Sequence, residues 1–434
     1  GAASAPLPRR PVRWRRGAGG WSMADGAAAD APRWESACKV FDEDVRGAGA
    51  AIRAVACTDS LVVTSSSRPV VKVWQVAEAG LTASQSLSLV ESHGAVGSSC
   101  VEVASAGEGH LAAVCYDDGG IGLWDLRSGK RTVELEADIP AAWKAKFLPG
   151  GRRLVSGGPS GSLFFWELRA GGRLEREVGV RSSHGRTKDD LTDVKRRRTD
   201  TKAPLGGSND LNGTDKFDKH GSPVYSLAVS PDGQLLSCGR GSGAISVMRL
   251  DADDGQGWAR DVSAHWSSEK STAAVRALTF DTDSRLVLSG GDDQQVCVFD
   301  ASAWAQRRAA EARRCSQLER FPAHRGWVTS VSTCPDPTRR VVVSTSWDGT
   351  VKLWDYCTHS LLHTYKDHTD SVFGSAFAPS DGRFFVSVGV DAQIVLYTAQ
   401  HETTTAVRSV RWAHETKGLK EEAVKVQVKG GQAV

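Results

Sequence analysis

The stretch FPAHRGWVTSVSTCPDPTRRVVVSTSWDGTVKLWDYC, residues 321–357, has the pattern of a single structural unit. VTSVSTC alternates in polarity as a half-buried strand does, and CPDPT then supplies a turn. VVVSTS is typical of a fully buried strand, WDG forms a second turn, and TVKLWD is a further strand. Pro335 and Pro337 fall in the first turn, where a sheet does not need the N–H that proline lacks. The stretch therefore predicts antiparallel strands joined by tight turns.

The same unit recurs along the chain. Four times an Asp stands six residues before an aromatic, and each pair follows a His; the sets are His93 with Asp118 and Trp124, His265 with Asp293 and Phe299, His324 with Asp348 and Trp354, and His368 with Asp391 and Tyr397. Further copies end at Trp74, Trp166 and Met248. A repeat of this period indicates a repeat architecture, and its Asp-to-Trp spacing resembles the WD repeat. Seven four-stranded copies predict an all-β, seven-bladed WD-repeat β-propeller.

One more strand is needed to close the ring. ACKVFDEDV, residues 37–45, has strand character but precedes the first complete unit. We expect it to form the outer strand of the seventh blade and so to join the two ends of the ring. Pairing in this way removes the open sheet edge that the seam would otherwise present.

The repeated His, Asp and Trp side chains favour a structural role over a catalytic one. In WD repeats these groups form a buried hydrogen-bonded chain with a strand Ser or Thr, and a carboxylate can be buried only when it is paired in this way. Catalysis needs one such set, whereas here the set recurs. Arg68, Ser160 and Ser242 replace the Asp in the first, third and fourth units. These three blades are expected to be looser than the others.

Composition restricts the function classes. The net charge of +3 is too small to indicate nucleic acid or anionic membrane as the main partner, and no apolar stretch is long enough to cross a bilayer. The nine cysteines are scattered singly without zinc-ligand spacing, so we expect reduced structural thiols and no metal or other cofactor. No nucleophile elbow, zincin motif or phosphate-binding loop occurs, so we expect no enzyme activity.

Three segments stand outside the ring, which we place at 38–400. Residues 1–37 are expected to be a disordered leader; 1–22 is Arg-rich and acid-poor like a transit peptide, but we interpret it as a translated upstream leader before Met23. The insertion 174–218 is too polar to bury a core and is expected to be disordered. Within it, the run formed by Lys195, Arg196, Arg197 and Arg198 resembles a nuclear-import signal, or is simply a solvated charge run. The tail 401–434 is polar.

A partner would bind where the innermost strands begin. The residues that open these strands should face one mouth of the central channel, and we expect a partner-binding rim composed of Arg53, Trp143, Tyr225, Arg276, Trp327, Thr329 and Phe373. Large aromatics and arginines dominate the energetics of protein interfaces. The alternative is that some of these rings lie flat and fill the channel mouth. Direct nucleic-acid binding is not indicated, because the aromatics are not set in a basic stripe.

Several blades resemble one particular family. The stretch 323–398, including FVSVGVDAQIVLYT, is similar to the last two blades of the WD-repeat subunit of the superkiller (Ski) complex; 275–300 is similar to its fifth blade and 137–158 to its third. The resemblance covers most of residues 38–399. Trp143 and Arg276 match family positions of the same type, whereas Phe373 stands where the family has a Trp. The leader, insertion and tail have no counterpart in the short animal form.

The resemblance implies a non-enzymatic scaffold. Its expected partners are a tetratricopeptide-repeat protein and an RNA helicase, in an assembly that feeds mRNA to the exosome for 3′-to-5′ decay. In some lineages a similar subunit joins the Paf complex in nuclear transcription elongation, so we expect cytoplasmic and nuclear localisation. A substrate receptor of a ubiquitin ligase is a further alternative, supported only by the fold.

Overall fold

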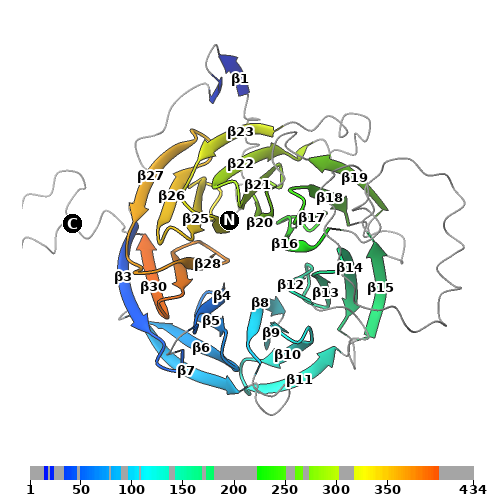
Figure 1. The fold of residues 1–434 in the computed structure, drawn as a ribbon, viewed down its shortest axis with the longest axis vertical. Coiled ribbons are helices and arrows are strands. Elements are labelled where there is room, and N and C mark those ends of the chain that lie inside the picture. The colour runs from blue at the N-terminus through cyan, green and yellow to red at the C-terminus, as the bar shows by residue number, and fades with distance from the viewer. Residues whose placement is uncertain are drawn as a thin grey trace, which may run out of the picture.

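The computed structural model places its strands in a closed ring (Figure 1). The residues that the structure describes are 14–17, 20–23, 34–45, 49–77, 80–88, 96–106, 109–135, 142–168, 173–179, 222–250, 260–266, 273–302 and 317–399.

Seven four-stranded antiparallel sheets form the blades of this ring. From the channel outward, blade 1 comprises β4 (Ile52–Cys57), β5 (Leu61–Ser66), β6 (Val70–Ala77) and β7 (Gly80–Ser88), and blade 2 comprises β8 (Ser98–Ala106), β9 (Gly109–Tyr116), β10 (Ile121–Asp125) and β11 (Lys130–Leu135). Blade 3 comprises β12 (Lys144–Phe147), β13 (Arg153–Gly157), β14 (Ser162–Glu167) and β15 (Arg173–Gly179). Blade 4 comprises β16 (Val224–Val229), β17 (Leu235–Arg240), β18 (Ile245–Arg249) and β19 (Arg260–Trp266).

Blades 5 to 7 complete the circle. Blade 5 comprises β20 (Val275–Phe280), β21 (Leu286–Gly291), β22 (Gln295–Asp300) and β23 (Gln317–Pro322). Blade 6 comprises β24 (Val328–Thr333), β25 (Val341–Ser346), β26 (Val351–Asp355) and β27 (Ser360–Tyr365). Blade 7 comprises β28 (Val372–Phe377), β29 (Phe384–Gly389), β30 (Gln393–Ala399) and β3 (Trp34–Phe41). The predicted all-β seven-bladed propeller is confirmed.

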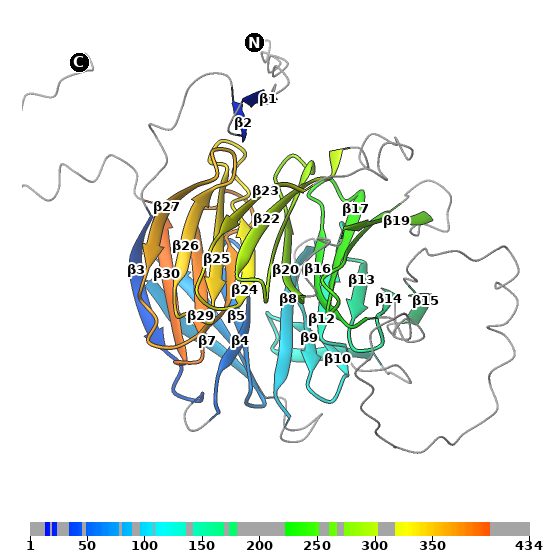
Figure 2. The ribbon, with the colours of Figure 1, turned by 45° about the horizontal axis from the view of Figure 1, so that its top comes forward.

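Closure by an N-terminal strand is confirmed as well. β3 pairs antiparallel with β30, from Trp34 opposite Ala399 to Phe41 opposite Gln393. Figure 2 shows β3, in blue, beside the orange β30. The strand begins at Trp34, three residues before the predicted boundary at 37. The reason is that the buried Trp34 ring packs on Phe385, with the ring centroids 5.3 Å apart, and so anchors the start of the strand.

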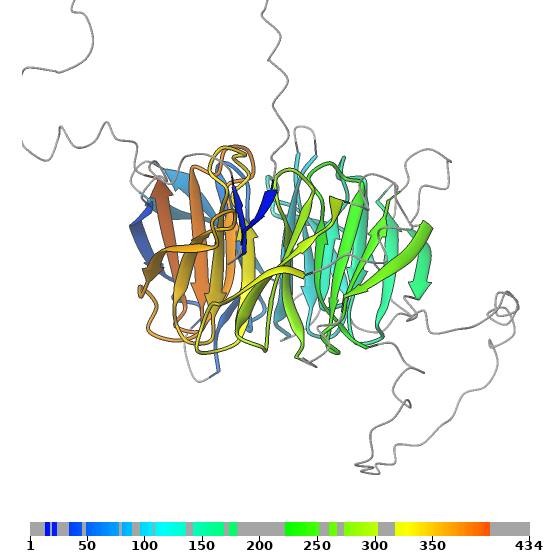
Figure 3. The same cartoon turned by 90° about the horizontal axis from the view of Figure 1, so that it is seen from above.

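The core lies between neighbouring blades. Second strands such as β25 are buried along their whole length, because the preceding blade covers one face of each sheet and the following blade covers the other. One cluster joins Val343 and Leu353 of blade 6 to Phe385 and Tyr397 of blade 7. The inner strands run roughly along the axis of the ring, as the side view in Figure 3 shows. The inner strands therefore all begin on the same face, which is called the rim face below.

The structure places strands inside two segments that were expected to be disordered. β15 occupies residues 173–179, inside the segment expected to be disordered from 174, because RLEREVG pairs with β14 as the outer strand of blade 3. Within the expected leader, β1 (Trp14–Gly17) pairs with β2 (Gly20–Met23) in a hairpin that closes at Gly17 and Gly20. The rest of the insertion after residue 179, with its basic run Lys195, Arg196, Arg197 and Arg198, and the tail 401–434 lie outside the described residues.

Candidate protein-binding site

Blade 6 carries a complete hydrogen-bonded chain at the rim face. The buried His324 ring lies 2.8 Å from Ser344 Oγ through Nε2 and 3.1 Å from Asp348 Oδ2 through Nδ1. The indole of Trp354 donates to the same Ser344 oxygen at 2.9 Å. Burial opposes the charge on Asp348, but the hydrogen bonds from His324 and Thr350 outweigh it and lower the pKa of Asp348. These bonds fix the position of the β25–β26 turn.

Blade 7 repeats the arrangement with a Tyr in place of the Trp. His368 lies 3.0 Å from Asp391 Oδ1 and 2.7 Å from Ser387 Oγ, and Ser387 lies 3.5 Å from the Tyr397 hydroxyl. Burial again opposes ionisation of Asp391, yet the hydrogen bond with His368 keeps its pKa below the ordinary value. Both sets connect a loop, a turn and two strands, so they hold the blade in shape.

In the other blades, the residues that the structure describes show only part of this chain. The indoles of Trp74 and Trp166 donate to Thr64 at 3.0 Å and to Ser156 at 2.9 Å. In blade 2 the indole of Trp124 donates instead to the Tyr116 hydroxyl at 2.9 Å. A Cβ on the facing Gly122 would lie 1.9 Å from that hydroxyl, so the glycine leaves room for it.

The remaining predicted members of the chain are only partly described. Asp118 and Asp293 each accept a backbone N–H two residues ahead in their turns, at 3.1 and 3.2 Å. His93 lies outside the described residues. The structure describes the backbone of His265, which lies in β19, the outer strand of blade 4, opposite Ser246.

Four residues of the predicted rim, with one further residue, form a continuous run of stacked groups across blades 3 to 6. Trp143 stacks on Tyr225 with ring centroids 5.4 Å apart. The Arg276 guanidinium lies over Tyr225 at 5.4 Å and over Trp327 at 4.5 Å. Trp327 then stacks on Trp347 at 4.5 Å. We call these five residues the aromatic run.

Ionic and backbone contacts hold the aromatic run in place. Arg276 is paired with Asp292 through two hydrogen bonds, which direct its planar group between the rings on either side. A Cβ on Gly326 would lie 2.8 Å from the backbone nitrogen of Asp348, so only glycine lets the loop before Trp327 pass so close to the turn. The rings are therefore positioned before any partner arrives.

Trp347 is a rim residue that the sequence reasoning missed. It precedes the turn Asp of blade 6 rather than opening an inner strand, and its side chain is 48% exposed, compared with 36% for Trp327. The sequence did contain a signal for it: a large apolar Trp stands immediately before the turn Asp, although a solvent-exposed turn has no structural need for an apolar side chain there. Its backbone carbonyl accepts a hydrogen bond from Ser371 of blade 7 at 3.1 Å.

The other predicted rim residues lie apart from the aromatic run. Arg53 pairs with Asp117 of blade 2 at 2.7 Å, and Phe373 is half-buried at the start of blade 7. The hydroxyl of Thr329 donates to the Val372 carbonyl at 2.6 Å and so links blade 6 to blade 7. The small polar side chain turns toward a neighbouring backbone group that a large ring could not approach.

The described residues hold little sign of other chemistry. No group of three or more His, Cys, Asp or Glu side chains among them could hold a metal ion. In the same part of the chain, no helix has the length and apolar character needed to cross a membrane. The half-buried and exposed rings and guanidinium of the aromatic run have the composition of interface hot spots.

Comparisons with known proteins agree with the fold. The model of the family described as "WD domain, G-beta repeat" matches residues 213–247, 261–300, 315–355 and 359–398. The chain is 28% identical over 338 residues to a "Ribosome biogenesis protein WDR12 homolog" of Chlamydomonas reinhardtii, which covers 73% of this chain and 67% of that protein.

Two further relatives match over shorter stretches. "Protein hir1" of Emericella nidulans is 24% identical over 42% of this chain and 18% of its own length. "Guanine nucleotide-binding protein subunit beta" of Zea mays is 31% identical over 37% of this chain and 40% of its own length. Such propellers are typically non-enzymatic and serve protein–protein interaction. The seven blades and the four matched repeats show that the chain is a seven-bladed β-propeller with WD40 repeats.

Proposed function

We propose that this protein is a scaffold that holds partner proteins by binding short segments of them along the aromatic run. The observation that carries the proposal is the exposed Trp327–Trp347 pair, continued by Arg276 and Tyr225. Rings held in place lose little conformational entropy on binding, so a partner side chain placed on them gains most of its burial free energy.

The assembly we propose is the superkiller complex, with a tetratricopeptide-repeat protein and an RNA helicase as partners. Support comes from the resemblance of the third, fifth, sixth and seventh blades to that family. Trp143 and Arg276, which match family positions, are both members of the aromatic run. Membership of the Paf complex, with nuclear localisation, rests on the same resemblance.

A second candidate is an assembly that acts in ribosome biogenesis. The similarity to the Chlamydomonas reinhardtii relative, which extends over 73% of this chain, favours it. A ubiquitin-ligase receptor role has no comparable observation in its favour. Each candidate predicts a different set of bound proteins.

Affinity purification of the tagged full chain, followed by mass spectrometry, tests the proposal. A helicase together with a tetratricopeptide-repeat protein supports the superkiller assembly, polymerase-associated factors support the Paf complex, and ribosome assembly factors support the second candidate. Trp327→Ala combined with Trp347→Ala should remove the partners. Phe41→Ala, which truncates a 46% exposed ring on the outer strand of blade 7, is the matched control. Unchanged binding by the double variant would reject the aromatic run as the docking site.

A further inference from the structure

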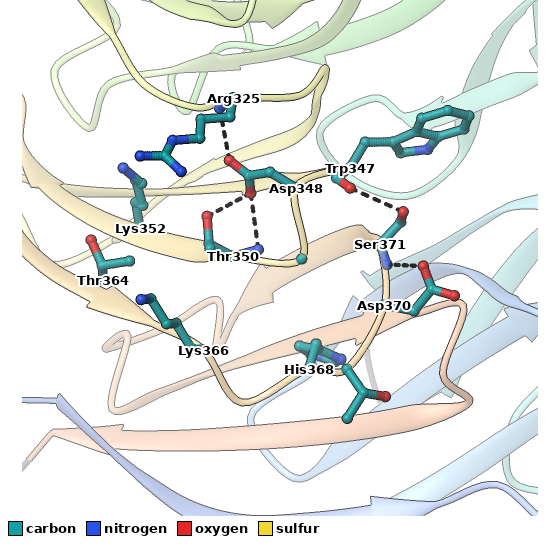
Figure 4. A pocket seen from close by; sticks show the side chains of 12 residues that line it. Arg325, Trp347, Asp348, Thr350, Lys352, Thr364, Lys366, His368, Asp370 and Ser371 are labelled. Carbon is teal, nitrogen blue, oxygen red and sulfur yellow. Dashed lines mark hydrogen bonds between the residues drawn. The ribbon is translucent and has the colours of Figure 1, made fainter.

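A cavity of about 680 Å³ lies over blade 6 on the rim face (Figure 4). Its walls are the connection from blade 5, which carries Arg325, and the connection to blade 7, residues 366–371. The β25–β26 turn, from Trp347 to Thr350, forms its inner end. The cavity is therefore continuous with the aromatic run.

We propose that this cavity binds an acidic segment of a partner protein, in which an apolar residue on Trp347 is followed by Asp or Glu side chains. The inference rests on the proposed function and extends it by naming the chemistry of the bound segment. Three cationic side chains, Arg325, Lys352 and Lys366, carry the argument.

These three cations lie together from different parts of blade 6. Lys352 of β26 is directly opposite Thr364 of β27 in the register, and Lys366 follows Thr364 by two residues, just beyond the end of that strand. Figure 4 shows the Arg325 side chain reaching toward Lys352 across the turn. Among the residues that the structure describes, none of the three cations has a carboxylate within ion-pair distance.

Two carboxylates, Asp348 and Asp370, line the same cavity and partly offset this charge. Asp348 accepts from the backbone N–H groups of Arg325 and Thr350 at 2.8 and 3.0 Å and contacts His324. Asp370 accepts from the Ser371 N–H at 2.6 Å. The three cations of the lining therefore exceed its carboxylates by one.

Like charges gathered in one cavity repel one another, and an anionic ligand relieves that repulsion. The hydroxyls of Thr364 and Thr369 line the same cavity and supply further donors to carboxylate oxygens. At the inner end, the indole of Trp347 offers a flat apolar surface that is 48% exposed. A segment lying radially across blade 6 would thus meet an aromatic first and cations next.

Fluorescein-labelled synthetic peptides test the proposal. One series carries a Leu followed, after spacers of increasing length, by Glu-Glu-Glu, and its twin series carries Gln-Gln-Gln. Fluorescence anisotropy with the full chain should show the best Glu peptide binding about tenfold or more tightly than its twin at low salt, because three exposed ion pairs contribute modestly each. The difference should shrink as salt screens the charges.

Matched variants separate charge from folding. Arg325→Gln, Lys352→Gln and Lys366→Gln together keep the aliphatic stems and should bring the two peptides to equal affinity. Arg127→Gln, Lys130→Gln and Arg285→Gln together remove three exposed cations from the opposite face and should leave the difference intact. Circular dichroism and melting temperature establish that each variant is folded.

The outcomes distinguish this inference from the proposed function. Equal affinity of the Glu and Gln series for the unmodified chain overturns the acidic-segment site, whatever the Trp variants do. Preference for Glu that survives the Arg325, Lys352 and Lys366 variant overturns the assignment to this cavity. Preference for Glu that is lost in that variant supports the acidic-segment site. This holds even where Trp327→Ala with Trp347→Ala leaves the co-purifying proteins unchanged, a result that would reject only the aromatic run as the docking site.

Discussion

The indoles of Trp327 and Trp347 stack 4.5 Å apart at an interplanar angle of 24°, although they come from different elements of blade 6. A backbone hydrogen bond of 3.0 Å from the Trp347 N–H to the Trp327 carbonyl sets their separation. The pair is therefore fixed by main chain rather than by packing of the rings alone. Two exposed indoles held in this way lose little freedom when a partner covers them.

Blade 2 should be sensitive to a single methyl group. Gly122→Ala places a Cβ against the Tyr116 hydroxyl and should cost about 1–3 kcal/mol of unfolding free energy through overpacking. Tyr116→Phe should also destabilise, because the buried Trp124 indole loses its acceptor. Urea unfolding of both single variants and the double variant measures the coupling.

The double variant, Tyr116→Phe with Gly122→Ala, should cost less than the sum of its parts, because the nearest clash, with the hydroxyl at 1.9 Å, is gone. Strict additivity would mean that the two positions do not share the space that the geometry assigns to them.

The closing strand should depend on one ring. Trp34→Ala removes a buried indole that packs edge-on against Phe377 at 5.6 Å and lies beneath the Arg339 guanidinium. We expect a loss of about 3–5 kcal/mol. Phe41→Ala at the other end of β3 should change stability by less than about 0.5 kcal/mol, since that ring is 46% exposed. Thermal melts of the two variants decide this, and equal losses would refute the special role of Trp34.

One turn can be improved. The residue after the turn Asp has a positive φ in most blades, 76° at Gly349 but 65° at Gln294, where a side chain is present. Gln294→Gly should raise the unfolding free energy by up to about 1 kcal/mol, because the left-handed conformation penalises a Cβ. Gly349→Ala should lower it by about 1–2 kcal/mol. Denaturant midpoints for both variants test the sign, and a destabilised Gln294→Gly would contradict the argument.

Asp281 should make the fold less stable as pH rises. Burial raises the pKa of Asp281 to about 6, above the value of about 3.9 in an unfolded chain. Between these two values the folded protein keeps a proton that the unfolded chain has released, so this group lowers the unfolding free energy from about pH 4 to pH 6. The change is up to about 3 kcal/mol.

Asp281→Asn should flatten that part of the pH profile. The amide oxygen can still accept the N–H groups of Arg285 and Leu286, now at 2.7 and 2.8 Å from Asp281 Oδ1. Asp381→Asn, at an exposed turn carboxylate that accepts the Arg383 N–H, is the control and should leave the slope as it is. Chemical denaturation at a series of pH values gives both slopes; an unchanged slope in Asp281→Asn would exclude this carboxyl as its source.

The blades should open in a definite order. Blades 6 and 7 have the complete His–Asp–Ser chain, whereas Arg68, Ser160 and Ser242 stand in the Asp position of blades 1, 3 and 4. Hydrogen exchange followed by mass spectrometry should therefore show faster exchange in the second and third strands of blades 1, 3 and 4. Uniform protection of all seven blades would contradict the expectation.

The ring could be predicted because its inner strands are buried and therefore have an apolar composition that can be recognised in the sequence. Outer strands were harder, since they face solvent and show no hydrophobic period. RLEREVG in β15 contains four charged residues, so its composition matches that of the polar insertion that follows it. Trp34 was missed for a related reason: a single apolar residue in a polar stretch gives no period, and only its contact with Phe385 reveals its role.

The rim was predictable where a simple positional rule applies. Reading the residue at or next to the start of each inner strand found Trp143, Tyr225, Arg276 and Trp327, which the structure places in contact along the run. The rule also selects Thr329, whose hydroxyl bonds to the next blade and which is not one of the stacked groups. It could not find Trp347, which comes from a turn. Side chains contributed by turns depend on how closely two loops approach, and a strand pattern does not encode that distance.

The pairing of β3 with β30 has a consequence for synthesis on the ribosome. The strand that completes the last blade emerges before any blade exists, and its partner follows roughly 350 residues later, on the order of tens of seconds at ordinary translation rates. Until then the edge of β3 has no partner strand and must be kept from pairing with strands of other molecules. A chain that ends before β30 leaves β3 without its partner. The exposed β3 edge then distinguishes an incomplete product from the finished ring.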